Sequence, residues 1–291
     1  MSLALSSELR AQIIDGIRVG NVVPYLGCGA LEGVVATADG APMPADSDSL
    51  ILAMNDGKPM SPKLMYEFSR AAMHVELKRG RGAVEKFLTR TYGEKTAWTR
   101  SRLHDWLRDI RPPYVIDINR DTQLQDSYAD VPHILIVGLA RIGGSDFRFK
   151  LFRFETGEYR EIQPEAAQEA IDQAPPILFK PMGSPRPRPY YVASDADYVD
   201  YLTELMGGFG VPAFVKQIRV GKRYLLLGLR LVRDTERMVL ADIIHNAANP
   251  AGWAFIPDAT DKERRFCEKL RLQIIDTGWE AMLTNETLAT A

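Results

Sequence analysis

The sequence has few cysteines and no long apolar run, and both shortages narrow the classes of protein that fit it. Cys28 and Cys267 are the only cysteines among 291 residues, and two cannot build a disulfide framework or a four-cysteine zinc site. We therefore predict no zinc, no other metal and a reducing, cytoplasmic location. No stretch of about 18 apolar residues is present, so no membrane span is expected. The first residues, MSLALSSELRAQ, lack the charged start and apolar core of a secretory signal.

The charge is nearly balanced, with 36 basic and 38 acidic residues and a net charge of −2. No basic run is long enough to predict nucleic-acid binding. The densest basic stretch, LKRGRG at 77–82, is interpreted as a solvated helix end and turn. We expect neither nucleic acid nor a membrane among the partners.

Alternating strand-like and helix-like segments predict an α/β fold, a Rossmann-like and mostly parallel sheet with helices on both faces. We predict one domain over 1–291. Within it, residues 36–111 form a helical insertion after the first strand, because their helical patterns have no convincing strand between them. Helices are expected at 6–20, 62–77, 82–92, 96–110, 195–208, 233–248 and 261–272, and strands at 21–26, 112–119, 133–138, 146–155, 175–180, 223–231, 252–256 and 272–276.

Two details of these elements are open to a direct check. Pro24 weakens the prediction of the first strand, because proline cannot donate a hydrogen bond to a central ladder. Ser6 or Ser7 is the expected N-cap of the first helix, and Asp195 that of the helix at 195–208.

The loop after the first strand, LGCGAL, is the first candidate for chemistry, because ligands of open α/β sheets bind beyond the carboxyl ends of strands. Gly27 and Gly29 lack side chains, so their backbone N–H groups can approach a phosphate closely. Cys28 between them would lie among donors that lower a thiol pKa. A tight turn filled by a small residue is the alternative interpretation.

The loop after the second strand, DINRDTQLQ, is the next candidate. Asn119 and Asp121 can place an amide and a carboxylate in the same cleft. The alternative is a turn in which Asp121 caps the next helix. FKPMGS follows the strand at 175–180, and LGLRLVRD contains the end of the strand at 223–231.

These loops, in this order, resemble the sirtuin-like NAD-binding family, especially its bacterial, zinc-free branch. The matching segments extend from about Ile13 to Ile275 and are VVPYLGCGAL, IDINRDTQLQ, LFKPMGS, SDADYVDYLTEL and YLLLGLRLVRD. The resemblance implies a cleft for NAD or an ADP-ribose-type nucleotide. Its expected contacts are Gly27 and Gly29 at the pyrophosphate, Asn119 and Asp121 at the nicotinamide ribose and carboxamide, and Gly228 near the adenosine; Cys28, Gly183, Ser184 and Arg230 are assigned to the same site.

The departure from this family that matters most is Met182, which stands where the family has its catalytic His. Imidazole titrates near neutral pH and can accept a proton from a hydroxyl or water. A thioether has no proton to exchange, and loss of a positioned base costs about 10²–10⁴-fold in rate. His74, His104, His133 and His245 are interpreted as surface or packing residues; His104 is the nearest to a substitute, because inserted helices can cover a cleft.

Three hypotheses about function follow. The first is a pseudoenzyme or sensor that binds the nucleotide as a small-molecule partner without the family's base. The second is an NAD-consuming hydrolase of the glycohydrolase type, with Asn119 in a catalytic role and a base other than His. The third is a structural, complex-forming protein with a vestigial cleft. Protein deacetylation is not expected, and self-association into a homo-oligomer is expected by analogy alone.

Overall fold

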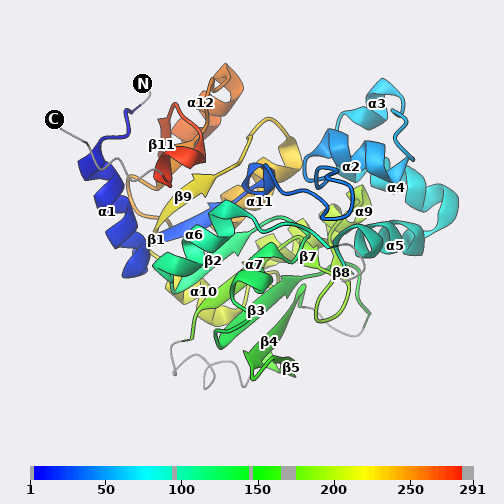
Figure 1. The fold of residues 1–291 in the computed structure, drawn as a ribbon, viewed down its shortest axis with the longest axis horizontal. Coiled ribbons are helices and arrows are strands. Elements are labelled where there is room, and N and C mark those ends of the chain that lie inside the picture. The colour runs from blue at the N-terminus through cyan, green and yellow to red at the C-terminus, as the bar shows by residue number, and fades with distance from the viewer. Residues whose placement is uncertain (1–2, 94–96, 144–146, 165–174, 284–291) are drawn as a thin grey trace.

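The computed structural model describes residues 3–93, 97–143, 147–164 and 175–283, and it confirms the predicted α/β class. Nine strands of these residues form one sheet, in the order β11-β10-β9-β1-β2-β6-β3-β4-β5. The strands from β11 to β3 are parallel, and β4 and β5 continue the sheet in antiparallel pairs. Figure 1 shows the sheet crossing the molecule with helices on both sides. Residues 96 and 146, where two predicted elements begin, lie outside the described residues.

The strands of the sheet are β1 (Val22–Leu26), β2 (Tyr114–Asp117), β3 (His133–Gly138), β4 (Phe149–Glu155), β5 (Glu158–Ile162), β6 (Ile177–Lys180), β9 (Arg223–Leu227), β10 (Gly252–Phe255) and β11 (Leu272–Ile275). A separate small ribbon pairs β7 (Gly183–Ser184) with β8 (Tyr190–Tyr191). The helices are α1 (Ser7–Arg18), η1 (Cys28–Leu31), α2 (Ser47–Met54), α3 (Pro62–Met65), α4 (Phe68–Arg79), α5 (Arg81–Tyr92), α6 (Arg102–Ile110), α7 (Gln123–Ser127), α9 (Asp195–Gly207), α10 (Ala213–Ile218), α11 (Asp234–Ile243), α12 (Asp261–Lys269) and η3 (Trp279–Met282).

Both faces of the sheet are buried, which explains why its strands read as nearly continuous apolar runs. In β1, Val23 and Tyr25 point into one core, and Val22 and Leu26 into the other. The first core is closed by α9, α10, α11 and α12, and the second by α1, α6 and α7. The prediction of helices on both faces is therefore confirmed.

β1 is a central strand in spite of Pro24. It pairs with β9 along its whole length, but with β2 only at Tyr25 and Leu26. Pairing with β2 thus begins one residue after the proline, so the ladder does not depend on the missing N–H group.

The helix caps are partly those expected. Ser6 caps α1, with its Oγ accepting from the N–H of Leu9 at 3.1 Å. The predicted cap of α9 was wrong by one residue: Ser194 is the N-cap, in a reciprocal capping box with Asp197, and Asp195 is the first helical residue. A serine hydroxyl at this position satisfies an orphan N–H group as well as a carboxylate would.

The helices inserted after β1 build a third, smaller core of their own. It joins residues of α2, α4 and α5, including Ile51, Ala72 and Leu88, with Tyr191 of β8. The helix expected at 62–77 is broken into α3 and α4, because Glu67 is extended (φ −156°, ψ 138°). Its buried carboxylate accepts a hydrogen bond from the hydroxyl of Thr235 in α11, which ties the insertion to the sheet domain.

Several features were not anticipated at this level of detail. Within the predicted insertion of 36–111, α6 packs in the second core through Leu103 and Leu107, in the same layer as α1. The helices α2 and α10 lie in stretches that were not predicted to be helical. The predicted hairpin strand at 146–155 corresponds to β4, and β5 is its partner.

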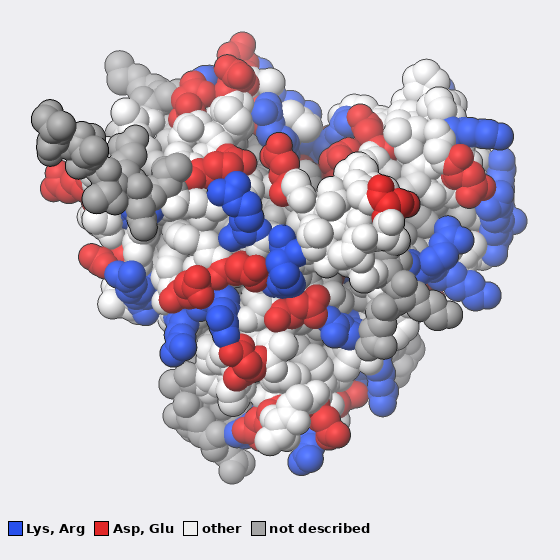
Figure 2. Space-filling view, in the orientation of Figure 1, with Lys and Arg blue, Asp and Glu red and all other residues white. Residues whose placement is uncertain are grey.

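The surface carries both signs of charge. On the face shown in Figure 2, acidic and basic side chains are interspersed, and basic ones gather at the right edge. The basic stretch at 77–82 is the end of α4, the left-handed Gly80 and the start of α5, as interpreted from the sequence. Within the described ranges, the helices are all too short or too polar to cross a membrane.

Candidate functional site

The candidate site lies at the carboxyl ends of β1, β2, β6 and β9. The strand order reverses here. After β1, the chain adds β2 on one side of it. Later, β9 pairs with the other side of β1, and β10 and β11 follow beyond β9. Ligands of open α/β sheets bind in the crevice at such a reversal. The loops after these four strands carry all of the predicted site residues.

A small cavity lies among these loops. Cys28, Asn119 and Met182, which follow three different strands, all line it. Its volume is about 50 Å³, which is room for a few water molecules. The other residues that line it are Ala45, Tyr92, Ile118, Arg120, Tyr198, Glu236 and Val239.

Asn119 is fixed by the loops around it. Its Nδ2 donates to the carbonyl of Gly27 at 2.9 Å and to Oδ1 of Asp117 at 2.8 Å. The same carboxylate oxygen accepts from the backbone N–H of Asn119 at 2.9 Å. Both hydrogens of the side-chain amide are thereby used, so Oδ1, an acceptor, is the atom of this amide available to the cavity.

Asp117 is the centre of a fully buried polar cluster behind Asn119. Its Oδ2 lies 2.7 Å from Nζ of Lys180 and 3.3 Å from Nε2 of His104. The other ring nitrogen of His104 lies 2.7 Å from the hydroxyl of Ser101. Burial by itself raises the pKa of Asp117, but the nearby Lys180 and His104 outweigh it and hold that pKa well below its usual range. His104 is therefore a packing residue, as interpreted, in a cluster that orients Asn119.

Cys28 lines the cavity as a protonated thiol. Burial and the charges of Glu236 and Asp46 raise its pKa to about 12, although the N–H groups of Cys28 and Gly29 act in the opposite direction. Desolvation therefore exceeds the effect of the backbone donors, and the thiol is not an activated nucleophile.

Met182 is almost fully buried in the wall of the cavity. The next residue, Gly183, has φ 96°, and a Cβ on it would lie 2.1 Å from the carbonyl oxygen of Tyr190, so only glycine fits there. Ser184 is buried and donates to Oε1 of Gln125 at 2.6 Å. Gly183 and Ser184 thus hold the position of Met182, and neither lines the cavity.

The glycines of the first loop allow two loops to pack closely. A Cβ on Gly27 would lie 2.6 Å from the carbonyl oxygen of Gly228, and one on Gly29 would lie 2.9 Å from its Cα. The N–H groups of Gly27 and Gly29 donate to Leu227 and Gly228 at 2.9 and 2.8 Å. In this conformation these two N–H groups are occupied, so a phosphate would have to meet other donors.

Of the predicted site residues, only Cys28, Asn119 and Met182 line the cavity; Asp121 and Arg230 are among those that do not. Asp121 is buried and accepts from the N–H of Gln123 at 2.6 Å, which is the turn of the alternative interpretation, but the N-cap of α7 is Thr122 and not Asp121. Burial, with Asp117 nearby, raises the pKa of Asp121. Arg230 pairs with Glu263 of α12 through two contacts of 3.0 Å.

Four residues with polar groups at the cavity were missed from the sequence: Tyr92, Arg120, Tyr198 and Glu236. Arg120 stands between Asn119 and Asp121, so the strand-end rule that selected its neighbours also covers it. It donates to the carbonyl of Val192 at 2.6 Å and to the hydroxyl of Tyr198 at 3.1 Å. Glu236 lies in the first turn of α11, where acidic residues are common, and the neighbouring sequence gives no sign that its side chain is buried.

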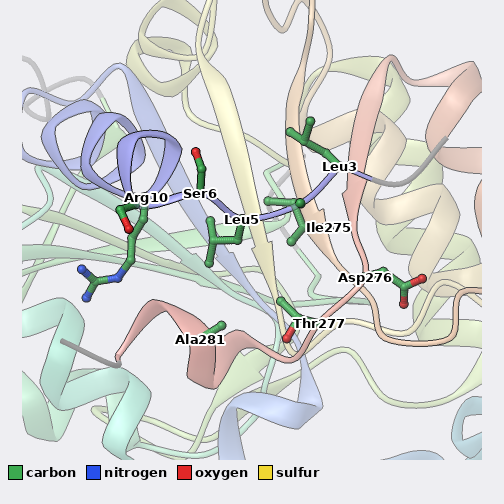
Figure 3. A pocket seen from close by; sticks show the side chains of 10 residues that line it. Leu3, Leu5, Ser6, Arg10, Ile275, Asp276, Thr277 and Ala281 are labelled. Atoms are coloured by element: carbon green, nitrogen blue, oxygen red, sulfur yellow. The ribbon is translucent and has the colours of Figure 1, made fainter. Parts of the chain in front are cut away.

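A larger cavity, of about 550 Å³, lies on another side of the molecule between the start of α1 and the loop after β11. Figure 3 shows its lining, with Leu5, Ile275 and Ala281 beside Ser6, Asp276 and Thr277. Arg10 there is bound to the carbonyl of Met282 at 2.7 Å, and none of the predicted site residues lines this cavity. Size alone therefore does not make it the candidate site.

The comparisons with known proteins add no assignment. No protein-family model matches the chain, and no curated protein matches it. In the part of the chain that the structure describes, no group of three His, Cys, Asp or Glu side chains is arranged to hold a metal ion.

Proposed function

We propose that the protein binds NAD or an ADP-ribose-type nucleotide in the cavity at the carboxyl ends of β1, β2 and β6. The observation that carries the proposal is the meeting of Cys28, Asn119 and Met182 in one cavity. The resemblance to the sirtuin-like family selects these positions from separate motifs. The resemblance implies that these three residues bind the same ligand, NAD or an ADP-ribose-type nucleotide.

The polar groups at the cavity suit parts of such a ligand. Asn119 Oδ1 is an acceptor for a ribose hydroxyl, because both hydrogens of its Nδ2 are bound to Gly27 and Asp117. Arg120 donates through Nε and Nη2 to the carbonyl of Val192. Its Nη1 is free of such bonds to the described residues, and it is suited to a phosphate oxygen.

The closed form of the cavity must open for this ligand. Nucleotide-sized pockets measure about 300–1,000 Å³, against about 50 Å³ here. Ala45 and Tyr92 come from the inserted helical segment and also line the cavity. Movement of this segment away from the sheet is therefore part of the proposal.

Isothermal titration calorimetry with NAD and with ADP-ribose tests the proposal. We expect saturable binding to the unmodified protein and binding at least about tenfold weaker to Asn119→Ala, the loss of one buried polar contact. Glu268→Gln, an exposed change on α12, is the control and should bind as the unmodified protein does. Absence of binding heat for both ligands at millimolar concentration would refute the proposal.

The proposal concerns binding and does not depend on cleavage of the ligand. Met182 has no proton to exchange, so the family's catalytic step has no base at this position. A second function, NAD hydrolysis, is favoured by one specific observation: the carboxyl group of Glu236 lines the same cavity, and its buried Oε2 has no hydrogen-bond partner among the described residues.

A further inference from the structure

Glu236 brings a carboxyl group to the same cavity as Asn119 and Met182. It is the third residue of α11, and Val239 on the next turn of this helix also lines the cavity. The Oε2 atom of Glu236 is buried and has no hydrogen-bond partner within the part of the chain that the structure describes. A buried carboxyl oxygen without a partner is costly, and such a group in a native structure calls for an explanation.

The neighbouring arginines make their contacts elsewhere. Arg237 donates to the carbonyl of Leu231 and pairs with Asp234. The guanidinium of Arg233 lies 4.7 Å from the ring centre of Tyr66. Glu236 is therefore close to positive charge without a direct ion pair among the described residues.

A role for Glu236 as a helix cap is also not supported. Arg233 is the N-cap of α11, and no side-chain cap hydrogen bond is formed there. A glutamate at the third helical position stabilises a helix start when it accepts from the N-cap N–H group. The structure instead leaves this carboxyl group facing the cavity, without a structural task in the helix.

We infer that Glu236 is the proton acceptor of an NAD hydrolase site, replacing the imidazole that the sequence lacks at Met182. This inference rests on the proposed nucleotide site. In the reaction, the bond between C1′ of the ribose and the nicotinamide nitrogen breaks, and its electron pair neutralises the pyridinium. Water adds to C1′, and its proton passes to the carboxylate of Glu236 and then to solvent. NAD and water thus give nicotinamide, ADP-ribose and one proton.

The cavity provides what this step needs. It has room for a few water molecules beside the carboxyl group. Asn119 Oδ1, in the lining of the same cavity, is suited to hold the ribose hydroxyls and so to direct C1′. Breaking this bond leaves positive charge on the ribose, which a nearby carboxylate stabilises electrostatically.

The pH dependence follows from the surroundings of Glu236. Burial, followed by the charge of Glu67, raises the pKa of Glu236 to about 8. Only the ionised form accepts a proton, so the rate should rise about tenfold per pH unit below about pH 8 and level off above it. The titratable and charged groups that face this carboxyl group or its cavity are Glu67, Arg120, Arg233, Arg237, Cys28, Asp46, Tyr25, Tyr92 and Tyr198.

The test measures nicotinamide release from NAD between pH 6 and pH 10, together with ADP-ribose binding by calorimetry. We expect Glu236→Gln to lose about 10²–10⁴-fold in kcat while it still binds ADP-ribose. Glu236→Asp, which keeps a carboxylate, should retain part of the activity and the pH-dependent rise. Glu268→Gln, the exposed control on α12, should behave as the unmodified protein, and circular dichroism checks that each variant is folded.

The outcomes separate the two proposals. ADP-ribose binding without nicotinamide release by the unmodified protein would overturn the role of Glu236 and leave the nucleotide site standing. Nicotinamide release at the same rate in Glu236→Gln and in the unmodified protein would also overturn the role of Glu236 and leave the nucleotide site standing. Absence of both binding and release would overturn both proposals.

Discussion

Nζ of Lys180 lies 2.7 Å from Oδ2 of Asp117, and both side chains are completely buried beneath the candidate site. The other oxygen of this carboxylate holds Asn119 by its backbone N–H and its side-chain amide. Lys180, at the end of β6, thereby holds the carboxylate of Asp117, and this carboxylate holds the amide of Asn119 that we assign to ligand binding. The stability of the fold and the geometry of the site depend on the same pair.

Lys180→Met should destabilise the protein by about 3–5 kcal/mol, because it leaves the charge of Asp117 buried without its partner. Urea unfolding measures this loss. The double variant Lys180→Met/Asp117→Asn removes both charges and should be less destabilised than the single variant. A double variant at least as unstable as Lys180→Met would contradict the pairing.

The pair of Lys180 and Asp117 should make the free energy of unfolding depend on pH in the acidic range. The pKa of Asp117 is held below its usual range in the folded protein. Its stabilising contribution is complete above the unfolded-state pKa of about 3.9 and is lost as pH falls below that value. The difference in unfolding free energy between the unmodified protein and Lys180→Met should therefore shrink from pH 7 to pH 3. Equal differences at both pH values would show that Asp117 does not titrate with the pair.

Much of the fold was predictable because the strands are short apolar runs covered on both faces. The break at Glu67 was not, because it depends on a contact with Thr235 of α11 that local patterns do not record. The helix α2 was not, because it depends on packing with α4 and α5 in the core of the insertion. The cap of α9 was predicted one residue too late, at Asp195 and not Ser194, because serine and aspartate both suit an N-cap.

The candidate site was predictable only where its residues directly follow strands. Asn119 and Met182 could be placed in one cleft, because the ends of parallel strands meet at one edge of a sheet. Glu236 could not, because an acidic residue in the first turn of a helix usually serves the helix dipole. It shares the cavity with Ala45 and Tyr92 of the insertion, which its local sequence does not record. Arg230, predicted from its motif, instead pairs with Glu263 of α12.

Both cysteines should resist labelling in the native protein. Burial raises the pKa of Cys28 and of Cys267 to about 12, so almost no thiolate is present at pH 8. Iodoacetamide should modify neither thiol at that pH within a time that suffices for complete reaction in urea. Mass spectrometry of the labelled peptides assigns each site, and rapid native labelling of Cys28 would contradict the protonated state.

Met182→His should increase nicotinamide release, because it places a titratable base at the position that matches the family's His. The gain should be smaller than the contribution of a positioned base, which is about 10²–10⁴-fold, because Glu236 already accepts the proton in the unmodified protein. It should appear above about pH 6.5, where imidazole is neutral. Met182→Leu is the matched control, because it conserves apolar volume without a base. Equal rates in the two variants, with ADP-ribose binding intact, would show that this position does not reach the ribose.

Glu236→Gln should stabilise the protein at alkaline pH and have little effect at pH 5. The pKa of Glu236 is raised to about 8, whereas an unfolded glutamate titrates near about 4.3. Between these values the folded state keeps a proton that the unfolded state has lost, so stability falls as pH rises, by about 1.4 kcal/mol per pH unit for this group. Glutamine does not titrate, so urea unfolding should show an advantage of the variant that grows from pH 5 to pH 8 and is constant above. The same difference at pH 5 and pH 9 would mean that this carboxyl group is ordinary and solvated.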